Sequence, residues 1–409
     1  MNPLQVLRVA VRALLRNKMR SFLTTLGVII GVSAVIAMVA IGEGAKARVQ
    51  DAFASMGSNL LVVLSGSTTA GGARGGFGSM PTLTWDDLKA IRTEASAVRY
   101  VAPQLRANAS VISEDQNWTT SITGTSPEFF LIRNWAVASG VAMSQSDVEG
   151  SNKVVVLGRT VVDKLYGPNA DPVGLSVRIK NIPFQIVGVL ERKGQSATGQ
   201  DFDDAAFIPY TTFSTKIQGG LKKYVSGAIL VSAATSDDTT RAEQQITNLL
   251  RDRHHIPIGG DDDFSVRNLA EMASAQQEGV NTLTTLLASI AAVSLLVGGI
   301  GIMNIMLVSV TERTREIGIR MAVGARPRDV MAQFLVEALA LSLAGGAIGV
   351  GLGIMAARQL AARFGWPTLV RPDIIVIAVG FSGVVGVIFG LYPARKAARL
   401  DPIEALRYE

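Results

Sequence analysis

Four long apolar runs divide the chain into membrane-spanning and water-soluble parts. The first run, residues 21–42, contains no charged residue and is long enough for a helix to cross a bilayer. Three more runs follow one another in the second half of the chain, at residues 282–310, 330–357 and 374–391. The pattern predicts an α-helical membrane protein with four transmembrane helices and a large domain between the first two.

The first 20 residues predict an amphipathic helix at the cytoplasmic face of the membrane. Apolar residues recur there at helical spacing between five basic residues, and no acid occurs. A cleavable signal peptide is the alternative interpretation of the run that follows. We disfavour it because residues 21–42 are longer than the about 7–15 apolar residues usual in signal peptides.

Residues 43–281 predict an α/β domain. Short apolar runs bounded by Gly and Pro indicate strands, at residues 59–64, 98–104, 110–113, 154–157, 176–179, 184–190, 228–231 and 264–267. Helices are expected at residues 85–93, capped by Thr84, and at 238–253, and Gly66–Met80 reads as a flexible loop. The order of elements predicts α/β parts at about 57–125 and 221–268, a β-rich insertion at about 126–220, and stalk helices at about 43–56 and 269–281.

Basic residues set the expected topology, because short loops rich in Lys and Arg stay in the cytoplasm. The N-terminal segment and residues 311–330 hold five basic residues each, and the tail at 392–409 holds four. The short loop at 358–373 holds three. We therefore expect both termini in the cytoplasm and the large domain, with loop 358–373, in the periplasm.

Residues 311–329 form a charged segment between two predicted spans. As a helix it would place Arg313, Glu316 and Arg320 on one stripe, with Ile317 and Met321 beside it. Gly324 and Pro327 mark its expected end. Such a helix at a membrane surface suits docking onto a soluble partner. The alternative is a solvated connector whose basic residues serve only to fix topology.

Glycines predict close packing of helices within the membrane. Gly345, Gly349 and Gly353 follow one another at four-residue spacing, and Gly27 and Gly31 show the same spacing in the first run. We expect these five residues to contact neighbouring helices, and Gly349 to support assembly of a dimer. Glu337 is the one acid within a predicted span, and an interfacial or helix-buried carboxylate is favoured over a functional one.

Composition excludes several kinds of chemistry. The chain has no cysteine and two histidines, His254 and His255, so thiol chemistry and a histidine-based metal centre have little to draw on. Asp203 with Asp204, and Asp261–Asp263, are expected in solvated turns, and the histidines at a helix end. No Gly-Lys pair occurs, so the sequence holds no phosphate loop of the Walker type. The net charge of +6 arises beside apolar runs, which fits lipid headgroups and not nucleic acid.

Several motifs together resemble the MacB-type (FtsX-like) ABC transporter permeases. The segment TREIGIRMAVGARPRDV is similar to their coupling segment, and Asn17–Ala45 to their first membrane helix. Tyr392–Glu409 resembles their C-terminal signature, while Val154–Gly167 and Asn181–Gly194 resemble their extracytoplasmic core. The matches fall in the same order along nearly the whole chain.

The resemblance implies a porter-like α/β periplasmic domain and a homodimer driven by cytoplasmic ATPase subunits. The chain begins at the amphipathic helix, so we expect the ATPase, with its ATP and Mg, on a separate polypeptide, and no enzyme activity or cofactor in this chain. The residues expected to contact the ATPase are Arg313, Arg315, Glu316, Arg320, Met321 and Arg326. Efflux through a periplasmic adaptor and an outer-membrane channel is the expected role.

Two other functions are weighed against efflux. The first is FtsX-like mechanotransmission, in which the same motion regulates a periplasmic enzyme or releases a lipoprotein. The second is secondary transport, which we disfavour because four spans with one intramembrane acid offer few ion-coupling groups. The sequence gives no indication of the substrate.

Overall fold

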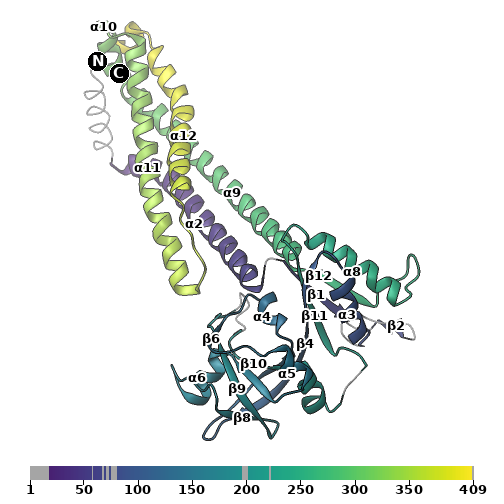
Figure 1. Cartoon of the computed structure of the whole chain (residues 1–409). Coiled ribbons are helices and arrows are strands. Elements are labelled where there is room, and N and C mark those ends of the chain that lie inside the picture. The colour runs from purple at the N-terminus through teal and green to yellow at the C-terminus, as the bar shows by residue number, and fades with distance from the viewer. Residues whose placement is uncertain are drawn as a thin grey trace. The chain divides into compact units, whose positions relative to one another are not determined.

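The computed structural model describes residues 18–57, 59–66, 69–70, 73–74, 81–195, 201–220 and 223–407. Contacts divide the chain into two compact units. The helical unit comprises the described residues of Met1–Arg48 and Gln277–Glu409, and the α/β unit comprises those of Val49–Gln276. Helices α2 (Lys18–Met56) and α9 (Leu269–Glu312) contribute residues to both units (Figure 1). The predicted amphipathic helix at 1–20 falls mostly outside the described residues.

The α/β unit is built on one mixed sheet of ten strands. The strands are β1 (Leu60–Ser65), β4 (Val98–Ile112), β5 (Asn117–Thr125), β6 (Val137–Gly140), β7 (Val154–Leu157), β8 (Ser176–Ile179), β9 (Ile182–Leu190), β10 (Ala205–Pro209), β11 (Gly227–Ala233) and β12 (Phe264–Asn268). Their order is β12-β1-β11-β4-β5-β10-β7-β9-β6, and β8 pairs with β4 and β9. The strands pair antiparallel except β5 with β10 and β7 with β9.

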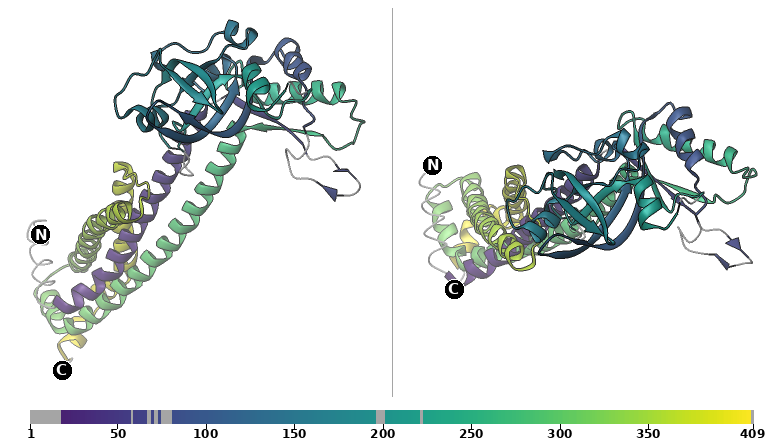
Figure 2. Two further views of the ribbon diagram at one scale, coloured as in Figure 1. Left: turned by 90° about the horizontal axis from the view of Figure 1, so that it is seen from below. Right: turned by 60° about the horizontal axis from the view of Figure 1, so that its bottom comes forward.

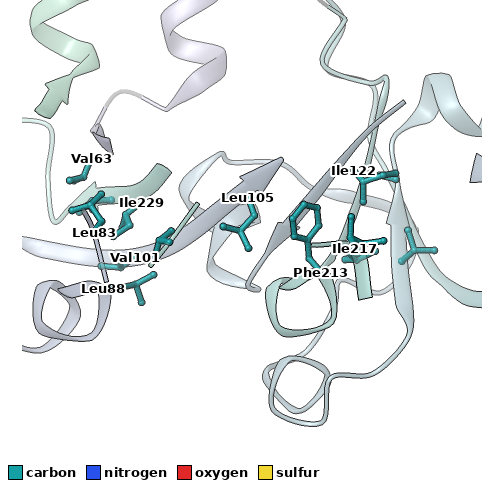
Figure 3. Close-up of a cluster of buried hydrophobic side chains, with 14 of the residues drawn as sticks. Val63, Leu83, Leu88, Val101, Leu105, Ile122, Phe213, Ile217 and Ile229 are labelled. Atoms are coloured by element: carbon teal, nitrogen blue, oxygen red, sulfur yellow. The ribbon is translucent and has the colours of Figure 1, made fainter. Parts of the chain in front are cut away.

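Short helices cover both faces of this sheet. They are α3 (Trp85–Glu94), α4 (Glu128–Ile132), α5 (Gln145–Glu149), α6 (Arg159–Tyr166), α7 (Tyr210–Thr212), the π-helix η1 (Phe213–Ile217) and α8 (Thr239–Arg253). Alternating residues of β4 face opposite sides, as the two-residue strand period requires. Val101 and Leu105 pack against α3 and η1 in the larger apolar core (Figure 3). Ala102 faces a second core that contains the α4 residues Phe129 and Phe130.

Most predicted elements of the α/β unit are confirmed, and one is wrong. Thr84 caps α3 through a reciprocal capping box with Asp87, as its sequence predicts. The two strands predicted at 98–104 and 110–113 are one strand, β4, because the polar residues between them still alternate across the sheet. Its partner β5 and the helix α6 were not predicted.

The proposed boundaries at residues 126 and 220 fall between elements, after β5 and before β11. The sheet nevertheless continues from the outer parts into the proposed insertion, since β5 pairs with β10 and β4 pairs with β8. The division into a porter-like part and an insertion therefore stays a prediction. In the predicted loop Gly66–Met80, β2 (Thr69–Ala70) pairs with β3 (Ala73–Arg74), and most other residues lie outside the described ones.

The predicted solvated turns at Asp203–Asp204 and Asp261–Asp263 are only partly solvated, because Asp203 is buried and Asp263 joins a partly buried ionic network. His254 caps the C-terminus of α8, as predicted, but its ring also lies between two carboxylates, with Nδ1 2.7 Å from Asp263 and Nε2 3.2 Å from Asp87. Arg253 donates to the same Asp87 at 2.7 Å. Asp203 is buried and accepts backbone N–H groups of Lys193 and Gly194.

In the part of the chain that the structure describes, four helices are long and apolar enough to cross a membrane. They are α2, α9, α11 (Pro327–Phe364) and α12 (Pro372–Ala398). The short helix α10 (Thr314–Ala322) lies between α9 and α11, and the short helix α13 (Pro402–Arg407) follows α12. The four predicted apolar runs lie within these helices, and the predicted stalk helices at about 43–56 and 269–281 form part of α2 and α9. Helix α12 continues past Leu391, with Pro393 inside the helix.

Candidate functional site

The charged segment between the second and third apolar helices folds as a separate short helix. Helix α9 ends at Glu312, and Arg313 leaves helical geometry before α10 begins at Thr314. The Thr314 hydroxyl donates to the Thr311 carbonyl at 2.8 Å, which satisfies an acceptor exposed by the break. Helix α10 ends at Ala322, Gly324 takes a positive φ of 105°, and Pro327 occupies the first turn of α11. The predicted end signals are therefore confirmed.

Arg313 does not share a stripe with Glu316, and this part of the prediction is wrong. As the N-cap of α10, Arg313 turns toward α11 and donates to both carboxylate oxygens of Glu337 at 3.3 and 3.4 Å. The Glu337 side chain is 4% exposed and the Arg313 side chain 24%. The pair fixes the start of α10 to the third apolar helix, and a lone buried carboxylate there would be costly.

The predicted pair between Glu316 and Arg320 is present. Arg320 donates to Glu316 within α10 at 2.5 Å and to Gln333 of α11 at 2.8 Å. Because Glu316 is half exposed, its ion pair contributes little to stability. Arg320 instead acts as a link that holds the end of α10 against α11.

A second face of α10 packs on the C-terminal helix α13. Ile317 and Gly318 are buried, and a Cβ atom added to Gly318 would lie 2.7 Å from the Cβ of Ala405. Asp401 caps α13 by accepting the Ile403 N–H at 2.9 Å. Met321, which was predicted to contact the ATPase, packs partly buried against the apolar core of the helical unit.

The remaining face of α10 is free among the described residues. Arg315 is exposed, and the exposed apolar residues Ile319 and Val323 follow at intervals of four, 49% and 84% exposed. Arg326 and Arg328 are also exposed at the start of α11. We call Arg315, Ile319, Val323, Arg326 and Arg328 the α10 face. Ile319 and Val323 were missed by the sequence analysis, although their spacing from Arg315 was a signal for them.

The five predicted packing glycines all lie at helix contacts within the helical unit. A Cβ added to Gly27 would lie 2.8 Å from Gly298 Cα of α9, and one added to Gly31 3.0 Å from Leu295. Added Cβ atoms at Gly345, Gly349 and Gly353 would meet α2 residues Val28, Val32 and Ile36 at 3.2, 2.8 and 2.8 Å. Helix α2 therefore touches α9, alongside which it runs in the left view of Figure 2, and on another side it touches α11.

No group of three or more His, Asp or Glu side chains is arranged to hold a metal ion within the described residues. The α10 face combines cationic groups with exposed apolar side chains on a firmly anchored helix, a composition that protein interfaces commonly have.

Two family models match the chain. Residues 21–249 match the MacB-like periplasmic core domain, and residues 288–402 match the FtsX-like permease C-terminal model. The second match contains α10 and all residues of the α10 face.

Curated relatives agree with these models. The chain is 41% identical over 454 aligned residues to the macrolide export ATP-binding/permease protein MacB of Syntrophobacter fumaroxidans, covering 98% of this chain and 63% of the relative. It is 44% identical to the protein of the same name from Azoarcus sp., covering 98% of this chain and 59% of that one. The chain thus spans about three-fifths of the length of the relatives it matches.

Among solved structures, the periplasmic region of MacB from Actinobacillus actinomycetemcomitans matches 55% of this chain and 95% of its own length. The sequence identity is 23% and the TM-score 0.44. The family assignment rests on the sequence matches above. The chain belongs to the MacB-like permease family, with a MacB-like periplasmic core domain and an FtsX-like permease C-terminal region.

Proposed function

We propose that this chain is the permease of an ABC transporter, and that it converts ATP hydrolysis by a cytoplasmic ATPase partner into motion of its periplasmic domain. The observation that carries the proposal is the α10 face, which is exposed while the rest of α10 is tied to α11 and α13. A surface that is accessible on one side and anchored on the other can transmit a push from a partner.

The anchors define how such a push would travel. Arg313 joins the start of α10 to α11, Arg320 joins its end to α11, and Gly318 lets α13 approach closely. Closure of two ATPase subunits would then shift α10, α11 and α13 together. The transport cycle would alternate between two arrangements of the helices whose populations depend on nucleotide.

The proposed topology places α10, α13 and both termini in the cytoplasm. Its support is the basic composition of this end, where Arg315, Arg326 and Arg328 are exposed. The loop between α11 and α12 and the α/β unit then lie in the periplasm. Reporter fusions at Thr125 should be periplasmic, and fusions at Pro327 cytoplasmic.

The relatives are named for macrolide export, and we propose export as the role of this chain as well. The working assembly would be a homodimer with two ATPase subunits, a periplasmic adaptor and an outer-membrane channel. ATP and Mg would bind to the ATPase. The FtsX-like match over residues 288–402 favours a second candidate, mechanotransmission to a periplasmic enzyme or lipoprotein. A deletion strain that becomes sensitive to macrolides would support export over that alternative.

The test of coupling changes one residue of the α10 face, Ile319, and one half-exposed residue beside it, Glu316. We expect Ile319→Asp and Glu316→Lys to leave the membrane level and the thermal midpoint nearly unchanged, since both side chains are about half exposed. Both should reduce recovery of the ATPase in co-purification and the coupled ATP hydrolysis. Ile258→Asp, at a fully exposed position of the α/β unit, is the matched control. Equal recruitment and activity in all variants would mean that the segment only fixes topology.

A further inference from the structure

Two neighbouring pockets open on one face of the sheet in the α/β unit. The larger has a volume of about 490 Å³ and is lined by residues of β1, β11 and β4, including Val62, Leu64 and Ala228. The smaller has about 40 Å³ and lies over β4, β5 and β10. Gln104 and Arg106 of β4 line both pockets, so the two adjoin, and we treat them together as one site.

Two arginines in this site have no anionic partner among the described residues. Arg133 follows α4 and lines the smaller pocket, where its Nε is buried and makes no hydrogen bond. Its guanidinium lies 5.6 Å from the ring of Phe202. Burial, and the positive charge of Arg106 beside it, lower the pKa of Arg133 to about 10. The Arg106 guanidinium is enclosed enough for burial to lower its pKa, although the residue keeps access to solvent at the mouth of the pocket.

A third cation lies beside these two. Lys193 donates to the backbone carbonyl of Arg133 and lies 5.3 Å from the ring of Trp135. Burial and the nearby Arg133 charge lower the pKa of Lys193 to about 8, against the opposing effect of Asp203. Three cationic groups therefore lie together in the site, at positions where burial disfavours their charged forms.

Two acids, Asp201 and Asp204, line the smaller pocket itself, and both already accept hydrogen bonds. Asp201 accepts from the Thr160 hydroxyl and the Asp203 amide, and Asp204 accepts from the Trp118 indole. Asp203 accepts the N–H groups of Lys193 and Gly194. Each carboxylate thus has donors of its own, and no ion pair joins any of them to Arg106 or Arg133 in the described part of the chain.

We propose that Arg106 and Arg133 bind the carboxylate or phosphate group of a small amphiphilic ligand, whose apolar part occupies the larger pocket. Guanidinium groups suit planar or tetrahedral oxyanions, and a buried unpaired donor is otherwise rare. A pocket of about 40 Å³ has room for roughly three water-sized atoms, which matches such a group. Gln104 and Thr123 supply further polar groups at its floor.

The larger pocket explains why the ligand should be amphiphilic. Val62, Leu64, Pro81, Val225 and Ala228 supply an apolar wall, and the polar side chains of the lining are Ser65, Ser226, Gln104 and Arg106. An alkyl or aromatic portion would bury there without unsatisfied polar groups. The site is distinct from α10, and it stands whether or not the proposed coupling to an ATPase is correct.

The experiment uses the full chain in phosphatidylcholine nanodiscs and four probes: hexyl phosphate, hexanoate, inorganic phosphate and hexanol. We expect hexyl phosphate or hexanoate to bind more tightly than inorganic phosphate or hexanol by calorimetry. Arg106→Gln and Arg133→Gln should each weaken that binding by about tenfold or more, the usual effect of losing a charge-assisted hydrogen bond. Arg178→Gln, an exposed arginine of β8, should leave it unchanged.

Ligand-free stability separates a binding role from a structural one. A partly buried guanidinium with an unpaired donor should not stabilise the empty protein, so Arg133→Gln should keep or raise the thermal midpoint. Equal affinity for hexyl phosphate and hexanol would contradict the proposed site. Unchanged affinity for hexyl phosphate in both Arg106→Gln and Arg133→Gln would contradict it as well. If Arg133→Gln unfolds, Arg106→Gln and Arg133→Lys carry the same test. Loss of hexyl phosphate affinity in phosphatidylglycerol discs would identify a lipid headgroup as the oxyanion, and unchanged affinity a free solute.

Discussion

The two units solve the problem of close packing in different ways. The α/β unit fills the space behind its sheet with large apolar side chains, such as Leu105, Ile122 and Phe213 (Figure 3). The helical unit removes side chains at its contacts instead, so that backbones meet at Gly27 and Gly298. The large apolar residues of α9 and α12 point outward, where water would penalise them and lipid does not.

The two units also differ in the number of partners that a buried carboxylate has. In the α/β unit, Asp87 receives hydrogen bonds from His254, Arg253 and Thr84. In the helical unit, buried Glu337 has one charged partner, Arg313. Where water is excluded and polar groups are few, loss of one partner leaves a buried charge uncompensated. In a network, other donors still stabilise the charge when one partner is lost.

The largest effect should come from removing Arg313. Arg313→Met leaves the Glu337 carboxylate buried without its cation, which should cost about 3 kcal/mol of unfolding free energy. The double variant Arg313→Met with Glu337→Met should recover most of that loss, because no charge is then left unpaired. Unfolding of the purified protein by sodium dodecyl sulfate, followed by circular dichroism, measures both.

Arg315→Met removes an equal charge from the exposed side of α10 and should have little effect on stability. An equal loss of unfolding free energy in Arg313→Met and Arg315→Met would mean that the buried Arg313–Glu337 pair does not stabilise the helical unit.

The second prediction concerns the glycine contacts. A leucine at Gly349 would collide with Val32 and with the Ile29 carbonyl of α2, and should destabilise the helical unit by about 3 kcal/mol. Gly351→Leu is the matched control, because open space surrounds that position on the same helix. Thermal unfolding in detergent compares the two. Lost dimer content with an unchanged midpoint in Gly349→Leu would instead place this face between subunits.

The third prediction tests the ionic network of the α/β unit. The carboxylates of Asp87 and Asp263 raise the pKa of His254 from 6.5 to about 9, against the effect of burial. The raised pKa means that the stabilisation is complete below about pH 6.5 and is lost as the pH rises through about 9. The loss should amount to about 2–3 kcal/mol. Denaturation followed by tryptophan fluorescence suits this test, because Trp85, Trp118 and Trp135 lie in this unit.

His254→Gln should remove this dependence on pH. His255→Asn is the control, since the neighbouring residue is exposed and has a positive φ that Asn tolerates. A slope that persists in His254→Gln would assign the effect to other groups.

Sequence reasoning was strongest where one local signal decides the structure. The apolar runs located all four long helices, Thr84 marked the start of α3, and Gly324 and Pro327 marked the turn after α10. The spacing of Glu316 and Arg320 predicted their ion pair. In each case residues within a few positions of one another supply the whole interaction.

Partners distant in sequence could not be predicted. Glu337 meets Arg313 only because α10 turns back along α11, and Gly318 meets Ala405 only because α13 returns to the same end. The network around Asp87 joins α3 to the end of α8, and a pattern of isolated aspartates does not reveal it. The unpaired arginines were missed for the same reason, since Arg106 and Arg133 come from a strand and a turn that the tertiary fold brings together.

The position of β1 in the sheet sets an order for folding. This strand is the first of the unit to be synthesised, yet both of its neighbours, β11 and β12, come from the end of the domain. The backbone N–H and C=O groups along both of its edges stay unpaired until Gly227–Asn268 has been made, and such long-range pairing forms slowly. During that interval β1 is a target for mispairing and aggregation, so the unit is expected to need protection until its last strand arrives.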